Sequence, residues 1–300
     1  MKFFYSDHFV LPLPAGHRFP ANKYTLLRQR VSASELAADG SLSIPEAASK
    51  EQLTLAHDAE YVRRVFDGEL SDKEIRRIGF PWSPELVERS RRSVGGTIAA
   101  CREALDKGIA ANLAGGTHHA YADHGEGYCV FNDVAVAART MQAEGSIHRV
   151  VILDCDVHQG NGTAAIFLDD PSVYTFSIHG AKNYPFHKEP SDLDIALPDG
   201  AQDSEYLEVL RWGVWQSLLL AQADLAIYLA GADPFVGDRL GRLALSMEGL
   251  GQRDRLVFEL CCQAGLPVAI TMSGGYAKRV EDTVDIHLQT LHLAQEILGR

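Results

Sequence analysis

The chain of 300 residues is 46% hydrophobic and 23% charged, and its formal net charge is −12 at pH 7. This composition is ordinary for a globular protein with a large core, and the acidic balance excludes a dedicated nucleic-acid binder, which would carry a basic face. No apolar run approaches the ~20 residues of a membrane-spanning helix. We therefore expect neither direct contact with nucleic acid nor a membrane among the partners.

The cysteines and the first residues indicate a compartment. Five cysteines without a CxxC pair predict free thiols in a reducing cytoplasm. Asp7, His8, Pro12 and Pro14 interrupt the start of the chain, which lacks the apolar pattern of a secretory signal. We expect a cytoplasmic protein and, because no repeat or low-complexity tract divides the sequence, a single domain over residues 1–300. The sequence does not indicate the oligomeric state.

From about residue 93, helical segments alternate with short apolar runs, whereas the polar stretch 31–51 is interpreted as a surface excursion. The expected strands cover 109–114, 149–154, 173–178, 225–229 and 268–272, and the expected helices cover 133–144, 163–168, 205–221, 248–264 and 280–298. Apolar strands separated by helices indicate an α/β protein with a parallel sheet covered on both faces. Trp212 and Trp215, in the third of these helices, are interpreted as core or interface residues.

Polar residues follow the ends of four of these strands. GGTHHA follows the first, DCDVHQGNGT begins at the end of the second, and AGADPF and SGGY follow the last two. The carboxyl ends of parallel strands meet at one edge of a sheet, where ligands bind. The side chains expected together at that edge are His118, His119, Asp154, Asp156, His158, Asp233 and Tyr276.

Three of these residues form a plausible metal site. Asp156 and His158 are two positions apart in an extended segment and so point the same way, and Asp233 follows another strand. Imidazole and carboxylate suit Zn²⁺, and catalytic zinc keeps three protein ligands and one open position. The alternative is an ordinary loop in which an aspartate caps the helix near Thr163, but the matching groups at other strand ends favour a metal.

A histidine pair and a tyrosine could supply the remaining chemistry. His118 and His119 follow a buried strand and two glycines, which favours an active-site pair over a surface or core pair; either ring could carry a proton near neutral pH. Asp154 and Asn161 are candidates to accept a hydrogen bond from the ring nitrogen of each histidine that faces away from the reacting groups. Tyr276 is either a packed aromatic or, as its SGGY setting favours, a donor to an oxygen that becomes negative.

Five motifs, in this order and at these distances, resemble the zinc-dependent histone deacetylase family: GGTHHA, GYCVFNDVA, DCDVHQGNGT, AGADPFVGDRLG and SGGY. The stretches GHRFP, GDRLGRLALSMEG, RDRLVFE and TMSGGYAKR are most similar to its class IV branch and to bacterial histone deacetylase-like amidohydrolases. The resemblance covers nearly the whole chain. It implies the arginase/deacetylase fold, with three α/β/α layers around an eight-stranded parallel sheet.

The resemblance also assigns catalytic roles. The ligands of one Zn²⁺ per chain, which also suit Fe²⁺, are matched by Asp156, His158 and Asp233. His118 and His119 match the family's histidine pair, the second being the general base and acid, and Tyr276 matches the tyrosine that stabilises the transition state. Asn161 stands where many relatives have an aspartate, and an amide there supports His119 less well as a cation.

Further positions match a cation site and the walls of a substrate tunnel. Asp154, behind the first histidine, and Ser177 match a structural monovalent-cation site, which implies K⁺. The expected substrate-binding residues are Gly127, Tyr128, Leu240, Gly274 and Gly275. A phenylalanine is commoner in the family at the position of Tyr128, on the wall that grips the acyl-lysine stem.

The implied activity is hydrolysis of the amide that joins an acetyl or long-chain fatty acyl group to the Nε of lysine in a protein or peptide. The alternative within this chemistry is an acetylpolyamine deacetylase, which acts on an acylated small amine. An arginase-type ureohydrolase would need a second metal, but Gly160 stands where a further carboxylate would be required. A non-catalytic acyl-lysine reader would lack part of the site, whereas this chain has every member.

Overall fold

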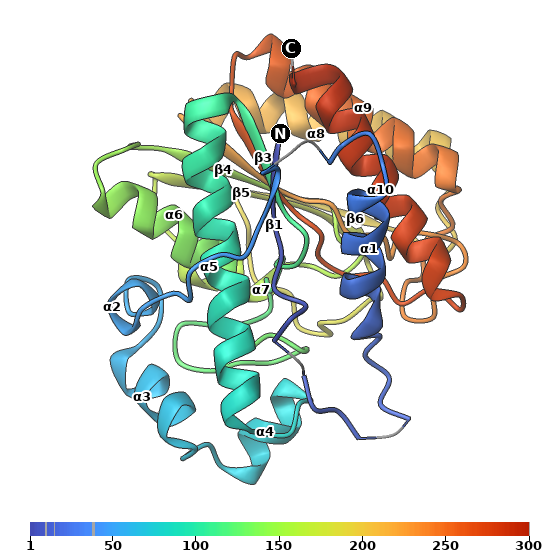
Figure 1. Cartoon of the computed structure of the whole chain (residues 1–300). Helices are drawn as coiled ribbons and strands as arrows, with labels where there is room; N and C mark the ends of the chain where they lie inside the picture. The colour runs from blue at the N-terminus through green and yellow to red at the C-terminus, as the bar shows by residue number, and fades with distance from the viewer. Residues whose placement is uncertain (10, 15, 38–39, 300) are drawn as a thin grey trace.

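The computed structural model describes residues 1–9, 11–14, 16–37 and 40–299 of the chain. Over these residues, eight strands form one sheet in the order β2-β1-β3-β8-β7-β4-β5-β6, and all neighbouring strands are parallel (Figure 1). The strands are β1 (Lys2–Phe4), β2 (Leu42–Ser43), β3 (Ile109–Asn112), β4 (Val150–Asp154), β5 (Val173–Gly180), β6 (Leu193–Leu197), β7 (Leu225–Leu229) and β8 (Val268–Thr271). The expected eight-stranded parallel sheet is confirmed.

Helices connect the strands and cover the sheet. They are α1 (Asn22–Ser32), α2 (Lys50–Leu53), α3 (Ala59–Asp67), α4 (Asp72–Ile78), α5 (Pro84–Lys107), α6 (Asp133–Ala143), α7 (Asn161–Ile166), α8 (Asp203–Ala221), α9 (Met247–Gln263) and α10 (Val280–Leu298). No helix within the described ranges combines the length and the apolar character needed to cross a membrane.

Alternate residues of the central strands pack into two separate cores. In β4, Val151 and Leu153 lie in the core shared with α1, α8, α9 and α10, while Val150 and Ile152 lie in the core shared with α5 and α6. This alternation follows from the two-residue period of a strand, and it buries both faces of the sheet. The three-layer α/β/α arrangement is therefore confirmed (Figure 1).

The long helix α5 illustrates how local sequence sets these layers. The Ser83 hydroxyl accepts from the backbone N–H of Leu86 at 3.1 Å, Pro84 opens the first turn, and Gly108 ends the helix at φ 84° and leads directly into β3. Within α5, a Cβ atom at Gly96 would lie 2.7 Å from Oδ1 of Asn112. The glycine therefore allows the helix to pack closely against the end of β3.

The elements expected from residue 93 onward are present, and each end lies within two residues of its expected position. The short helix expected over 163–168 is observed as α7 and begins two residues earlier. The stretch 31–51 is not merely a surface excursion, because Leu42 and Ser43 pair with Phe3 and Phe4 and form the edge of the sheet. The core alternative for Trp212 and Trp215 is also wrong, since each is 52% exposed on α8.

Candidate active site

A cavity of about 380 Å³ opens at the carboxyl edge of the sheet. Loops after β3, β4, β5, β7 and β8 line it, and α1 and the first turns of α5 close one side. The sequence-predicted residues that line it are His118, His119, Gly127, Tyr128, Asp156, His158, Asp233, Leu240, Gly274 and Tyr276. Asp154, Asn161, Ser177 and Gly275 are not among its lining residues and lie behind them.

The proposed ligands converge from two strand ends. Nδ1 of His158 lies 3.0 Å from Oδ1 of Asp156 and 3.2 Å from Oδ2 of Asp233. One donor atom from each of the three buried residues falls within 4.8 Å of the others. His158 therefore presents Nδ1, not Nε2, toward the two carboxylates.

Backbone and hydroxyl groups fix the two carboxylates. Oδ2 of Asp156 accepts from the Ser273 hydroxyl and from the Gly274 N–H, both at 2.7 Å, and Oδ1 of Asp233 accepts from the Val157 N–H at 3.0 Å. A Cβ atom at Gly274 would lie 1.9 Å from Oδ2 of Asp233, so only a glycine permits this approach. The loop after β8 thus holds a carboxylate that follows β4.

The triad fits a divalent metal ion. Oδ2 of Asp233 is buried and accepts no hydrogen bond from the described residues, although Nδ1 of His158 lies 3.2 Å away. A buried carboxylate oxygen is costly to leave without such a bond. Burial and the neighbouring charge of Asp156 both raise the pKa of Asp233. A cation between these groups would satisfy the free oxygen and offset the repulsion, and one imidazole with two carboxylates is a suitable donor set.

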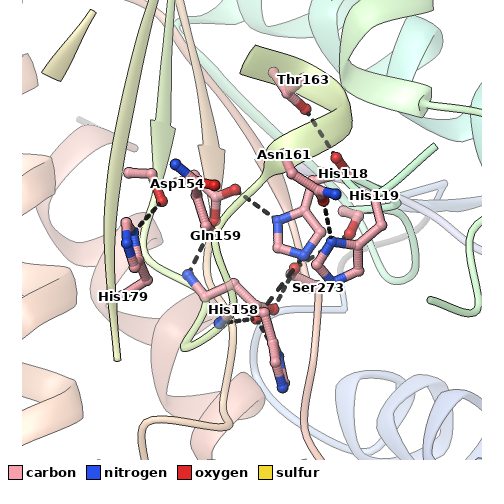
Figure 2. A network of polar contacts seen from close by, with 12 residues as sticks. His118, His119, Asp154, His158, Gln159, Asn161, Thr163, His179 and Ser273 are labelled. Atoms are coloured by element: carbon pink, nitrogen blue, oxygen red, sulfur yellow. Dashed lines mark hydrogen bonds and ion pairs between the residues drawn. The ribbon is translucent and has the colours of Figure 1, made fainter. Parts of the chain in front are cut away.

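The two histidines are supported differently. Nδ1–H of His118 donates to Oδ2 of Asp154 at 2.6 Å, and Nδ1–H of His119 donates to Oδ1 of Asn161 at 2.7 Å. Figure 2 shows the two rings side by side, each backed by its own acceptor; their centroids are 4.2 Å apart. The Nδ1 atoms of both rings are therefore protonated, so Nε2 is the nitrogen of each ring that can accept a proton.

The pKa values of His118 and His119 also differ. Burial lowers the pKa of His118, but Asp154 and Asp156 outweigh it and raise the value to about 9. Burial, reinforced by the positive charges of His118 and His158, lowers the pKa of His119 well below its usual value. At neutral pH His118 is the charged ring and His119 is the neutral one, which is the state that a general base requires.

A carboxylate not foreseen from the sequence lies behind Asn161. The Asn161 amide nitrogen donates to Oε1 of Glu126 at 2.7 Å and to the Tyr121 hydroxyl oxygen at 3.0 Å. Oε1 of Glu126 also accepts from the Tyr184 hydroxyl at 2.7 Å. These contacts fix which end of the Asn161 amide faces His119. No motif marks Glu126, because it lies in a loop whose closeness to Asn161 arises only on folding.

Tyr276 is buried at the cavity wall. Its backbone N–H donates to Oδ2 of Asp238 at 2.6 Å, and its carbonyl accepts from Nε of Arg239 at 2.9 Å. Burial raises the pKa of the phenol well above its usual value, so the hydroxyl keeps its proton and can donate it in a hydrogen bond. Gly275, at φ 144°, lies between this residue and the ligand-facing Gly274.

The other predicted wall residues are also at the cavity. Tyr128, at φ 67°, packs its ring 5.4 Å from that of Phe19 and 6.2 Å from that of Tyr276. A Cβ atom at Gly127 would lie 2.6 Å from Cδ2 of His119, so this glycine allows the wall to contact the imidazole. Leu240 lies on the wall, and its backbone N–H is held by Oδ1 of Asp238 at 2.8 Å.

The predicted cation-site residues are neighbours in the sheet. Asp154 of β4 pairs in register with Ser177 of β5. Oδ1 of Asp154 accepts from the Asp156 N–H at 3.0 Å, and the Ser177 hydroxyl lies 3.0 Å from Nδ1 of His179. Asp154 therefore links this buried polar group to His118.

Two buried cations that the sequence did not single out brace the site. Nζ of Lys23, on α1, donates to the Ser273 carbonyl at 3.0 Å and lies 5.5 Å from the centre of the Tyr276 ring. The Arg253 guanidinium, fully buried on α9, donates to the Gly231 carbonyl at 2.5 Å. The RDRLVFE stretch could have indicated the role of Arg253, because this arginine falls on the apolar face of the helix and a buried charge there needs a partner. Lys23 gave no such signal.

A parallel sheet that carries a buried Asp-His-Asp triad, a histidine pair and a tyrosine at its carboxyl edge is typical of one class: hydrolases of the arginase/deacetylase fold that act on amide bonds. Within this class, the chain belongs to the histone deacetylase family, since the model described as the histone deacetylase domain matches residues 17–291. The histone deacetylase homologue from Aquifex aeolicus has the same fold, with a TM-score of 0.85 and 24% identity, over 100% of this chain and 84% of that one.

Relatives cover most of the chain. An uncharacterized protein of Picosynechococcus sp. is 45% identical over 290 residues, which are 97% of this chain and 96% of that protein. Histone deacetylase 2 of Arabidopsis thaliana is 30% identical over 272 residues, covering 87% of this chain and 70% of that protein. The polyamine deacetylase HDAC10 of Homo sapiens is 29% identical over 272 residues, covering 81% of this chain and 40% of that protein.

Proposed function

We propose that this protein hydrolyses the amide bond between an acyl group and the Nε of lysine in proteins or peptides. One observation carries the proposal. The buried triad of Asp156, His158 and Asp233 shares a cavity with a neutral imidazole and a protonated phenol, those of His119 and Tyr276. Amide hydrolysis needs a base for water, an acid for the leaving amine and a donor for the oxyanion, and these groups supply them.

The proposed ion is Zn²⁺, one per chain, with Fe²⁺ as the alternative for the same ligands. When bound, it would polarise the substrate carbonyl and make a water molecule more acidic. Nε2 of His119 accepts a proton from the attacking water and returns it to the nitrogen of the leaving lysine. The charged His118 adds positive potential beside the reacting carbonyl, and the Tyr276 hydroxyl donates to its oxygen as negative charge develops.

The cavity walls would contact the methylene chain of the acyl-lysine. Gly127, Tyr128 and Leu240 line part of the cavity wall, and an apolar wall of this kind suits the four methylenes that lead to the amide. Acetyl is the proposed acyl group, and long-chain fatty acyl groups are proposed as further substrates. Comparing the rates of the two substrates measures the depth of the pocket beyond the triad.

Two further assignments belong to the same proposal. The buried group around Asp154 and Ser177 is proposed to hold K⁺, a structural ion that would fix the carboxylate behind His118. The GDRLGRLALSMEG and RDRLVFE stretches support placing the chain in the class IV branch of the family. Elemental analysis of purified protein for zinc, iron and potassium tests the metals directly.

The second candidate is an acetylpolyamine deacetylase, which the 29% identity to a polyamine deacetylase supports. The deciding experiment compares an acetyl-lysine peptide, a myristoyl-lysine peptide and acetylputrescine on zinc-loaded protein, with Tyr276→Phe as the inactive control. Peptide cleavage that the variant loses supports the lysine deacylase. Selective cleavage of acetylputrescine would transfer the site to polyamine substrates, and no turnover of any of the three would contradict both.

A further inference from the structure

The charged side chains that line the cavity outside the triad carry one sign of charge. Apart from the two carboxylates of the triad, the acidic and basic side chains that line the cavity, among the residues that the structure describes, are all basic: Lys23, Arg89, Lys182 and Arg242. A smaller hollow beside Leu240 and Tyr276 adds Arg18 and Arg239. The chain as a whole carries −12, so this basic mouth runs against its overall charge.

The local ion pairs leave this positive charge largely uncompensated. Nη1 of Arg242 lies 2.7 Å from Oδ2 of Asp199, and Nζ of Lys182 lies 4.0 Å from the same oxygen, so two cations share one carboxylate. The Arg89 guanidinium stacks 4.8 Å from the Tyr24 ring and has no carboxylate partner in the described parts of the chain. Lys23 is different, since it is buried and held by backbone carbonyls.

The exposed cations would interact electrostatically with the part of the substrate that stays outside the cavity. Arg242 and Lys182 are 52% and 73% exposed at their side chains, so they are free to approach a bound ligand. A mouth lined by one sign of charge concentrates ligands of the opposite sign and repels those of its own sign. The remote ammonium of an acylated polyamine would meet this positive potential, whereas a carboxylate next to the acylated chain would be attracted.

We propose, on the basis of the proposed deacylase function, that the substrate is an acylated amine with a carboxylate beside the acylated chain. Acidic residues flanking an acyl-lysine in a peptide provide this group. The α-carboxylate of free acyl-lysine provides the same chemistry, so the test separates the two sources. Lys182, Arg242 and Arg89 are the specificity-determining residues.

The test uses three blocked peptides that differ only in the residues beside acetyl-lysine, which are Glu, Gln or Lys. Acetyl-lysine with a free or an amidated α-carboxylate and acetylputrescine complete the set. The expected kcat/KM is about tenfold higher for the Glu peptide than for the Lys peptide, mainly through KM, and the ratio falls toward one at about 0.5 M salt. A preference for free acetyl-lysine over all three peptides identifies the small molecule as the source of the carboxylate.

Variants assign the preference to these residues. Arg242→Gln, Lys182→Gln and Arg89→Gln should each reduce the Glu-to-Lys ratio about two- to fourfold, and Arg242→Lys should retain it. Arg102→Gln is the matched control, because Arg102 is an exposed arginine on the same helix as Arg89 but near its other end. Asp199→Asn should raise the ratio, a gain that an unfolded variant cannot imitate.

Binding separates this inference from the proposed function. The dissociation constants of the same fluorescent peptides are measured by anisotropy on zinc-loaded Tyr276→Phe protein, which retains the mouth. Charge-dependent binding without turnover in the natural protein overturns the deacylase proposal alone. Equal kcat/KM and equal binding for the Glu and Lys peptides, together with no preference for free over amidated acetyl-lysine, overturns the carboxylate preference, as does no binding of either the peptides or acetyl-lysine.

Discussion

The Nδ1–H group of His119 donates to Oδ1 of Asn161 at 2.7 Å, and this contact determines which ring nitrogen faces the cavity. The orientation of the amide depends in turn on Glu126, whose Oε1 accepts from the Asn161 nitrogen at 2.7 Å. An asparagine alone could present either end to the ring. Glu126 therefore positions His119 through one intermediate side chain.

Replacing Glu126 should weaken catalysis without affecting substrate binding. Glu126→Ala removes the acceptor that orients the Asn161 amide, so we expect kcat to fall about tenfold or more with KM nearly unchanged. Glu126→Gln keeps an acceptor oxygen and should retain more activity. Nitrogen NMR of labelled histidine gives an independent readout, because His119 should lose its uniform Nδ1–H tautomer in Glu126→Ala; an unchanged tautomer would contradict the positioning role.

Tyr276→Phe should lower kcat by about 10²–10³-fold, the usual cost of losing one oxyanion donor. The aromatic ring stays in place, so the folded structure and the melting temperature should be preserved. Steady-state kinetics and thermal unfolding on the same zinc-loaded sample measure both quantities. Turnover close to that of the natural protein would remove Tyr276 from the mechanism.

Asp233→Asn should separate metal binding from stability. The substitution removes a buried charge that lies next to the like charge of Asp156, and this relief of repulsion offsets the loss of the 3.2 Å contact with Nδ1 of His158, so the metal-free variant should melt near the temperature of the metal-free natural protein. It should also lose the stabilisation that zinc gives the natural protein, as bound metal content and melting curves with and without zinc will reveal. A marked drop in the metal-free melting temperature would mean that this carboxylate is structural.

Arg253→Met should destabilise the fold through the site loops. The Arg253 guanidinium pairs with Asp254 at 2.8 Å and binds the Gly231 carbonyl, and both side chains of the pair are almost completely buried. Breaking a buried pair leaves a charge unpaired, at a cost of about 3–5 kcal/mol. Arg255→Met, two residues along the same helix, breaks only exposed pairs, with Glu296 and Glu259, and should change the free energy of unfolding little. Denaturant titrations compare the two variants.

The folded protein should lose stability as the pH falls from neutrality toward 4, in part through His57. Burial lowers its pKa to about 4, and its Nε2 accepts from the Asn132 N–H, so the folded protein holds this ring neutral. Because the unfolded chain binds the proton first, the stabilisation is complete above about pH 6.5 and is lost as pH falls to the folded pKa, up to about 3 kcal/mol. In a His57→Gln variant the free energy of unfolding should depend less steeply on pH over this interval; an equal slope would assign the acid sensitivity to other groups.

The sequence predicted the parts of the fold that have strong periodicity. The apolar runs that became β3, β4, β7 and β8 are buried on both faces, and the helices between them are long enough to be recognised. The missed strands β1 and β2 are three and two residues long, too short for a period to show, and β6 has only partly buried alternate residues. The helices before residue 93 follow no strand pattern, although Ser49 and Ser71 begin capping boxes.

The candidate site was predictable where chemistry follows a strand end. His118, Asp156, Asp233 and Tyr276 lie there, and the structure brings them to one cavity, while their catalytic roles stay predictions. Supporting contacts such as those of Glu126 and Asp238 were not predictable, since each joins residues from distant segments. Their residue types are common in surface loops, and only the folded distances distinguish them.

Lys23 has a wider consequence. Lys23 belongs to α1, but its Nζ donates to the carbonyls of Ser273 and Gly275. These carbonyls lie some 250 positions later in the chain, on the turn that presents Tyr276. Detachment of α1 would remove these two contacts and release the turn. The equilibrium between packed and detached α1 is therefore thermodynamically linked to the positioning of the Tyr276 hydroxyl. A ligand that contacts Tyr276 should therefore slow hydrogen exchange along α1, including turns that do not line the cavity.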